Sequence, residues 1–237
     1  MEDRAGRRGK VATDCSESEV RYYKEDFWRQ ENLKFGQSYY RLEKSARIIS
    51  SIARGREISL LDVGCGPATL MRLLPPSVDY TGIDIAIQEP APHLIEADLV
   101  ESPIDFDGRR FDIVIAQGFF EYMGNCQSQK LSEIANILAA DGKFIVSYWN
   151  FDHRNKEIYW PFSNICSIDE FRNGLSAYFK IDRSFPASHN WRQGVPARRL
   201  NKAINMNLNA NIPVISRKLA VEYYFICSLA SSGTAVS

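Results

Sequence analysis

The fold class of this chain is decided by one stretch, Ser59-Leu60-Leu61-Asp62-Val63-Gly64-Cys65-Gly66-Pro67-Ala68-Thr69-Leu70. The apolar run from Ile58 to Val63 is closed by glycines and predicts a buried parallel strand. Gly64 and Gly66 predict a sharp turn with an open backbone, because neither residue carries a Cβ. Pro67 suits the first position of a helix, which we expect over 68–74. A strand, a bare turn and a helix N-terminus together predict a ligand site.

Two acids accompany this turn. Asp62 lies on its approach, and Asp84 ends the next predicted strand, Val78 to Asp84. Asp84 follows Gly66 by eighteen residues, close to the spacing of about 20 at which an acid receives ribose hydroxyls in nucleotide-binding units. A strand-end turn aspartate is the competing interpretation. Thr69 replaces the third glycine of a dinucleotide fingerprint, which disfavours a nicotinamide-dependent oxidoreductase.

The segment Leu61-Asp62-Val63-Gly64-Cys65-Gly66 resembles the first motif of class I S-adenosylmethionine-dependent methyltransferases. Phe111-Asp112 is similar to the opening of the fourth strand in that family, and it begins the buried run up to Ala116. The resemblance implies an α/β fold with a seven-stranded, mostly parallel, doubly wound sheet and one antiparallel edge strand. It also implies S-adenosyl-L-methionine as cofactor.

The resemblance implies a set of cofactor-binding positions at the carboxyl ends of the strands. Asp84 would receive the ribose hydroxyls, Asp98 would accept from the adenine amino group, and the backbone N–H of Leu99 would serve the adenine ring. An unpaired loop acid is the alternative for Asp98. The complete predicted set is Asp62, Gly64, Cys65, Gly66, Asp84, Ile85, Asp98, Leu99 and Gln117.

The tip of the predicted fourth strand, Gln117-Gly118-Phe119-Phe120-Glu121-Tyr122, should face the transferable methyl group. It lacks the Asp/Asn-Pro-Pro-Tyr/Phe motif of enzymes that methylate bases or glutamine, which argues against those substrates. A hydroxyl acceptor needs a base within hydrogen-bond reach. The candidate catalytic residues are Glu121 and His153, with His189 as a further base, although a lone histidine is more often structural.

Aromatic residues near the N-terminus and after the fifth predicted strand are candidates for the substrate path. Aromatic faces attract a sulfonium cation, so Tyr22, Trp28 and Tyr148 could line the path of the methyl group. Packing of the N-terminal rings on the domain is an equally supported interpretation. Residues 148–153 and 163–171 also resemble the MetW-like branch of the fold, through two short motifs.

The chain divides into a polar tail over 1–19, an N-terminal helical cap or lid over 20–57 and a methyltransferase domain over 58–237. A basic insert at 189–217 contains five cations and no acid, including Arg198 and Arg199. These arginines could bind an anionic acceptor through bidentate hydrogen bonds. A partner-binding surface and a solvated face are the alternatives.

Composition narrows the functional classes further. Lysine plus arginine and aspartate plus glutamate both number 29, so the net charge of zero argues against nucleic acid as a partner. The five cysteines have no CxxC spacing, which predicts reduced thiols in a cytoplasmic protein and no metal site. No apolar stretch approaches the roughly 20 residues that span a bilayer, so no membrane association is expected.

The sequence therefore predicts a methyltransferase that acts on a small or medium-sized metabolite, by O- or N-methylation. The alternative is a catalytically silent methyltransferase-fold subunit that regulates or binds a partner.

Overall fold

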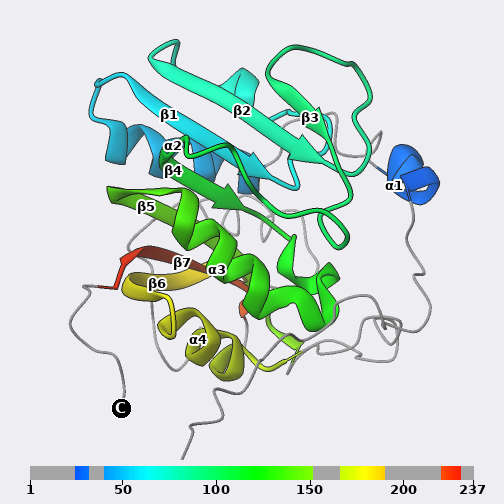
Figure 1. Ribbon diagram of the computed structural model, residues 1–237. Coiled ribbons are helices and arrows are strands. Elements are labelled where there is room, and N and C mark those ends of the chain that lie inside the picture. The colour runs from blue at the N-terminus through cyan, green and yellow to red at the C-terminus, as the bar shows by residue number, and fades with distance from the viewer. Residues whose placement is uncertain (1–24, 32–39, 152–165, 190–219, 231–237) are drawn as a thin grey trace, which may run out of the picture.

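The computed structural model describes residues 25–31, 40–151, 166–189 and 220–230 of the 237-residue chain. In this part of the chain one sheet has the strand order β3-β2-β1-β4-β5-β7-β6 (Figure 1). Its strands are β1 (Ile58–Val63), β2 (Val78–Asp84), β3 (Leu94–Glu96), β4 (Phe111–Ala116), β5 (Leu138–Trp149), β6 (Phe179–His189) and β7 (Ala220–Leu229). The described α-helices are α1 (Glu25–Glu31), α2 (Tyr40–Ala53), α3 (Gln127–Ile137) and α4 (Ile168–Ser176).

The sheet is mostly parallel, as predicted. Strand β1 pairs in parallel with both β2 and β4, and β4 pairs in parallel with β5. Strand β7 is antiparallel to both of its neighbours, β5 and β6. The seven-stranded, doubly wound class is confirmed, with the antiparallel strand inserted one position in from the edge. The strand order reverses between β1 and β4, and ligands of open α/β sheets bind at such a reversal.

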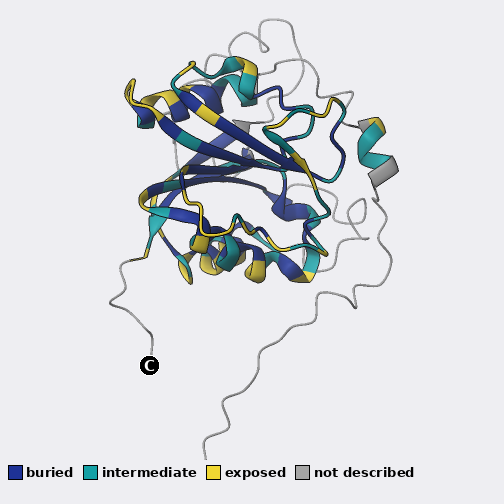
Figure 2. Cartoon of the chain, turned by 45° about the horizontal axis from the view of Figure 1, so that its top comes forward, coloured by how far each residue is buried: buried dark blue, intermediate teal, exposed yellow. Residues whose placement is uncertain are grey.

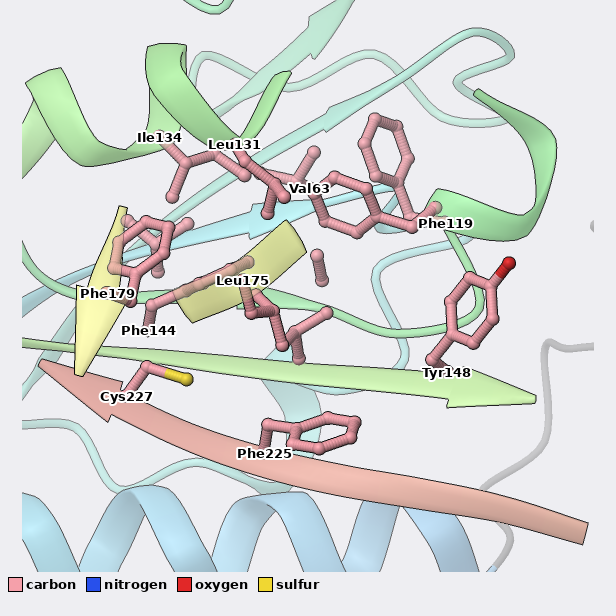
Figure 3. Close-up of a cluster of buried hydrophobic side chains, with 14 of the residues drawn as sticks. Val63, Phe119, Leu131, Ile134, Phe144, Tyr148, Leu175, Phe179, Phe225 and Cys227 are labelled. Atoms are coloured by element: carbon pink, nitrogen blue, oxygen red, sulfur yellow. The ribbon is translucent and has the colours of Figure 1, made fainter. Parts of the chain in front are cut away.

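Two hydrophobic cores cover the two faces of the sheet. On one face, α3 and α4 pack on a cluster that includes Val63, Phe144 and Phe225 (Figure 3). On the other face, α2 contributes Ile48 and Ile49 to a second cluster. The strands are buried between these layers, and exposed residues gather on the outer surface of the helices (Figure 2). Because alternate strand residues enter opposite cores, the central strands read as continuous apolar runs.

The predicted helix over 68–74 is wrong. The chain forms turns there and a single 3-10 turn, η3 (Met71–Leu73). Ala68 has a left-handed φ of 51°, which is incompatible with the first turn of an α-helix. The segment is also too short, because Pro75 and Pro76 follow at once and cannot continue a helix. No α-helix N-terminus therefore follows the glycine turn.

The predicted strands Ile58 to Val63, Val78 to Asp84 and Phe111 to Ala116 are present with these bounds, as β1, β2 and β4. Asp141 and Gly142 lie in a bulge inside β5, where the register jumps from Phe111↔Leu138 to Ile113↔Lys143. The Ser167 side chain caps α4, and Glu170 completes a capping box. The segment between β2 and β3, which contains Pro90 and Pro92, has no helix. No helix in the described ranges is long and apolar enough to cross a membrane.

Candidate cofactor and acceptor site

The glycine turn after β1 is anchored to β2 by its own backbone. Gly64 and Gly66 have φ values of 74° and 54°, which favour glycine. The backbone N–H groups of Gly64 and Cys65 both donate to the carbonyl of Ile83, at 2.8 and 3.2 Å. These two amides are therefore already bonded within the protein, and a ligand must be bound by neighbouring side chains, by carbonyls or by more distant amides.

Asp84 connects the turn to the loop after β2. Its Oδ2 accepts a hydrogen bond from the backbone N–H of Gly66 at 2.8 Å, and its Oδ1 accepts one from Ala86 at 3.0 Å. The residue is 8% exposed. Each carboxylate oxygen carries two acceptor sites, so these bonds leave capacity for ribose hydroxyls. The structure brings Asp84 and the glycine turn together, as the sequence predicted.

Asp62 is buried directly behind the same turn. Tyr80, on β2, donates its hydroxyl hydrogen to Oδ2 of Asp62 at 2.8 Å. Burial raises the pKa of Asp62 to about 7; the Tyr80 hydrogen bond opposes this shift, and the charge of Asp84 adds to it. Burial likewise raises the pKa of the Cys65 thiol well above its ordinary value. Tyr80 was not identified from the sequence, where it reads as an ordinary aromatic strand residue.

The adenine-side residues lie after β3. Asp98 forms a turn in which its Oδ1 accepts from the N–H of Val100 at 3.0 Å, and Leu99 is buried in the α3-side core. Ile85 follows Asp84 at the end of β2. These positions border the same edge of the sheet as the glycine turn, because parallel strands end together.

The tip of β4 is tied to β5, β7 and α2. Gln117 donates from Nε2 to the hydroxyl of Tyr224, on β7. The backbone N–H of Gly118 donates to Oγ of Ser147, on β5, at 3.1 Å. Phe119 packs against the glycine turn, since a Cβ on Gly64 would lie 3.2 Å from its Cδ2. The β4 tip and the glycine turn are therefore in contact.

Glu121 is a buried acid with unused hydrogen-bonding capacity. It lies in the 3-10 turn η4 (Phe120–Tyr122) and is 1% exposed. Its Oε1 accepts from the backbone N–H of Trp149 at 2.8 Å, whereas its buried Oε2 has no hydrogen-bond partner among the described residues. Burial raises the pKa of Glu121 to about 8, and the charge of Glu222 contributes to that rise.

An ion pair that the sequence did not reveal lies beside Glu121. Arg41, in the first turn of α2, donates from Nη1 to Oε1 of Glu222 at 3.1 Å. The pair joins segments 181 residues apart, so no local motif could have indicated it. The Arg41 guanidinium also approaches the β4 tip, because a Cβ on Gly118 would lie 3.6 Å from Nη1. Arg41 holds the pKa of Glu121 lower than burial alone would.

Helix α1 lies beyond the carboxyl ends of the strands, beside β3 (Figure 1). Arg29 donates to the carbonyl of Ile87 at 2.9 Å and to Oε2 of Glu96 at 3.1 Å. The Trp28 ring meets the ring of Tyr122 edge-on, with centroids 4.9 Å apart. Helix α1 therefore contacts both the β2–β3 segment and η4. The roles of the N-terminal region as a lid and of Trp28 in the substrate path stay predictions.

The predicted contact of Tyr148 with the methyl path is not supported by its position. The residue is fully buried, and Phe171 covers one face of its ring at a centroid distance of 4.0 Å. Its hydroxyl accepts from the N–H of Cys166 at 3.3 Å. Both contacts come from the segment that carries α4, so the ring serves packing below that helix.

Several predicted positions lie outside the described residues. These are Tyr22, His153, Arg198, Arg199 and the tail over 1–19. His189 ends β6, and only its backbone is described.

A methyltransferase-domain family model matches residues 37–196. A search of curated proteins finds no match. An S-adenosylmethionine-dependent methyltransferase from Archaeoglobus fulgidus shares the fold at a TM-score of 0.59 and 16% sequence identity, and the match covers 85% of this chain and 99% of that one.

Two further structures with the same fold contain S-adenosylhomocysteine. The N-methyltransferase NodS from Bradyrhizobium japonicum matches at a TM-score of 0.54 and 10% identity, covering 86% of this chain and 99% of its own. The plantazolicin methyltransferase BpumL, solved with a triazolic desmethyl-plantazolicin analogue, matches at a TM-score of 0.55 and 13% sequence identity. The match covers 85% of this chain and 90% of BpumL. The finer resemblance to the MetW-like branch stays a prediction. The chain belongs to the methyltransferase-domain family: it is a class I S-adenosylmethionine-dependent methyltransferase, with S-adenosylmethionine as its cofactor.

Proposed function

We propose that this enzyme methylates an oxygen or nitrogen atom of a small or medium-sized metabolite, and that the acceptor atom carries a hydrogen. The observation that carries this proposal is Glu121, a buried acid at the β4 tip with one oxygen bonded to Trp149 and the other without a partner among the described residues. Once Glu121 is ionised, its second oxygen needs a hydrogen-bond donor, and an acceptor atom that carries a hydrogen supplies one.

The described residues fit the cofactor. The Asp84 carboxylate lies beside Gly66, and a carboxylate oxygen can accept from ribose hydroxyls. The buried pair of Asp62 and Asp84 favours a positively charged ligand. We assign cofactor binding to Asp62, Gly64, Cys65, Gly66, Asp84, Ile85, Asp98, Leu99 and Gln117. When bound, S-adenosylmethionine supplies an electrophilic methyl group whose sulfur leaves as a neutral thioether.

Glu121 would act as the proton acceptor, with His153 as the second candidate. Because burial raises the pKa of Glu121 to about 8, the carboxyl group is largely protonated at neutral pH. It must ionise before it can take the hydrogen of a hydroxyl or ammonium group. The rate should therefore rise with pH and level off above about 8.

The names of two structural neighbours are consistent with this acceptor class. NodS is named as an N-methyltransferase, and BpumL is solved with an analogue of its plantazolicin acceptor. An anionic group elsewhere on the acceptor remains part of the proposal, through Arg198 and Arg199 of the basic insert.

The test is transfer of a labelled methyl group from S-adenosylmethionine to a native metabolite extract. We expect label in the small-molecule fraction, and we expect Glu121→Gln to lower kcat by about 10²–10⁴ while its cofactor Kd stays unchanged. Glutamine keeps the carbonyl that accepts from Trp149, so the variant isolates the proton-transfer role. The paired change Arg198→Ala and Arg199→Ala should raise the acceptor KM several-fold if the acceptor is anionic.

Cofactor binding without transfer to any fraction would support the silent, partner-binding alternative instead. Full activity of Glu121→Gln would remove Glu121 from the reaction and leave His153 as the base to test.

A further inference from the structure

A compact polar cluster lies behind the glycine turn, between β1 and β2. It contains the carboxyl group of Asp62, the thiol of Cys65 and the hydroxyl of Tyr80. Tyr80 is 6% exposed and Asp62 is 4% exposed, and the hydroxyl donates to Oδ2 of Asp62 at 2.8 Å. Both residues belong to neighbouring parallel strands, so the contact joins the approach of the turn to the strand that ends in Asp84.

Gly82 makes room for this cluster. It is the register partner of Asp62. A Cβ at Gly82 would lie 2.8 Å from Sγ of Cys65 and 3.1 Å from the hydroxyl oxygen of Tyr80. Any larger residue would displace one of these two groups, so the absence of a side chain at 82 lets the tyrosine hydroxyl reach Asp62.

The Tyr80 bond matters because Asp62 is in an unfavourable place for a charge. In the described part of the chain, no lysine or arginine pairs with Asp62, and the nearest charged neighbour is the like-charged Asp84. The other titratable groups that face it are Tyr80 and Cys65, whose pKa values are themselves raised by burial. On β4, the register partner of Asp62 is the apolar Ile115. Tyr80 thus supplies the one described side-chain hydrogen bond that favours ionised Asp62.

The cofactor carries groups of two kinds. Its ribose hydroxyls are neutral, and Asp84 is assigned to them. Its amino-acid end has an α-ammonium group, which needs an anionic acceptor near the glycine turn. Among the described acids behind that turn, Asp62 is the one that remains for it.

We propose that Tyr80 is a positioning residue of the cofactor site, which orients Asp62 and keeps it ionised as the acceptor for the α-ammonium group. The proposal rests on the cofactor placement given under the proposed function. Its consequence is that affinity for the amino-acid end rises with pH, because Asp62 binds a cation only when it has lost its proton. With a pKa of about 7 for Asp62, that rise falls between about pH 5.5 and 8.

The test compares two ligands by calorimetry over this pH range. S-adenosylhomocysteine keeps the α-ammonium group and has a neutral sulfur, whereas 5′-methylthioadenosine lacks the amino-acid end. For the wild type we expect affinity for the first ligand to rise with pH and affinity for the second to stay level. Tyr80→Phe should weaken S-adenosylhomocysteine binding about two- to tenfold at pH 7, the equivalent of one hydrogen bond, and should move the rise to higher pH. It should leave 5′-methylthioadenosine unchanged.

Tyr178→Phe is the matched control, because it also removes a tyrosine hydroxyl that is hydrogen-bonded, to Ser128 at 2.8 Å, in another part of the molecule. It should change the affinity for neither ligand. If Tyr80→Phe does not fold, Asp62→Asn replaces it and should give S-adenosylhomocysteine an affinity that is low and level with pH.

The inference is overturned if Tyr80→Phe, or in its place Asp62→Asn, has the wild-type affinity and pH profile. An equal loss for both ligands also overturns it, since the effect would then be a general distortion of the site. Failure of the wild type to bind S-adenosylhomocysteine at any pH would instead overturn the cofactor placement of the proposed function.

Discussion

The carboxyl edge of the sheet has two halves that are built differently. In the cofactor half, at the ends of β1, β2 and β3, the acids are bonded to nearby segments: Asp84 to Gly66 and Ala86, and Asp62 to Tyr80. In the acceptor half, at the ends of β4 and β5 and the start of β7, Glu121 has a buried oxygen without a partner among the described residues. The cofactor half is therefore largely preformed, and the acceptor half has a polar group left for a ligand to satisfy.

The largest effect is expected from a side chain in the glycine turn. Gly64→Val places a β-branched residue at a φ of 74° and a Cβ 3.2 Å from Phe119. Both the strain and the displaced β4 tip disturb the cofactor half, so binding of S-adenosylhomocysteine should fall below detection.

Gly55→Val is the control for this change. Gly55 also has a left-handed φ, 77°, but a Cβ there meets nothing within 4 Å. It carries the same backbone strain and should keep full affinity. Tight binding by folded Gly64→Val would place the cofactor elsewhere.

The second effect is a loss of the ribose acceptor. Asp84→Ala removes the acceptor of two backbone N–H groups and of the predicted ribose hydrogen bonds, each worth roughly 1.5–3 kcal/mol when charge-assisted. Affinity for S-adenosylhomocysteine should fall at least tenfold in calorimetry.

Asp112→Ala provides the comparison. Asp112 also accepts two hydrogen bonds, from the N–H and Oγ of Ser59, both at 2.8 Å, but at the opposite end of β1. Its loss should lower stability without a change in affinity. Equal affinities for wild type and Asp84→Ala would refute the ribose assignment.

The two halves also differ in how far the sequence predicted them. In the cofactor half, the key hydrogen bonds join residues 18 or fewer positions apart, so one strand, turn and strand pattern contains nearly all the participants. Only the tyrosine was missed, because its role depends on the space that Gly82, two residues further along the same strand, leaves beside the Cys65 thiol.

The acceptor half is assembled from distant segments. Its hydrogen bonds join residues that lie far apart in the sequence. Glu121 and Trp149 are 28 positions apart, Gln117 and Tyr224 are 107 positions apart, and Arg41 and Glu222 are 181 positions apart. The sequence analysis could place Glu121 and Gln117 at a strand tip because the apolar run from Phe111 to Ala116 predicts the strand itself. It could not show that the start of α2 and the start of β7 meet there, since that contact depends on the inserted antiparallel strand.

Local turn chemistry was a further limit. Pro67 and the glycines before it suggested a helix start, yet Ala68 is left-handed and two prolines follow within eight residues. The fold is preserved because β2 anchors the turn through the carbonyl of Ile83. The residue that anchors the turn lies on a neighbouring strand, so a motif within the turn segment alone cannot predict this contact.

The last expected effect concerns stability instead of ligand binding, and it compares the two buried acids. Folding raises the pKa of Glu121 from an ordinary 4.5 to about 8, so the folded state holds a proton that the unfolded state has released within this range. Wild-type stability should therefore fall as pH rises from about 4.5 to 8. Glu121→Gln cannot ionise, so its unfolding free energy relative to wild type should increase by an amount of order 1–3 kcal/mol between pH 5 and 8.5.

The unfolding free energy of Asp62→Asn relative to wild type should also increase with pH, over a pH range that ends nearer 7, because the Tyr80 hydrogen bond opposes the rise in the pKa of Asp62. Urea unfolding of the three proteins at several pH values measures both windows. A flat difference for Glu121→Gln would mean that Glu121 is already ionised through Arg41 at neutral pH, and the acceptor half would then be as fully paired as the cofactor half.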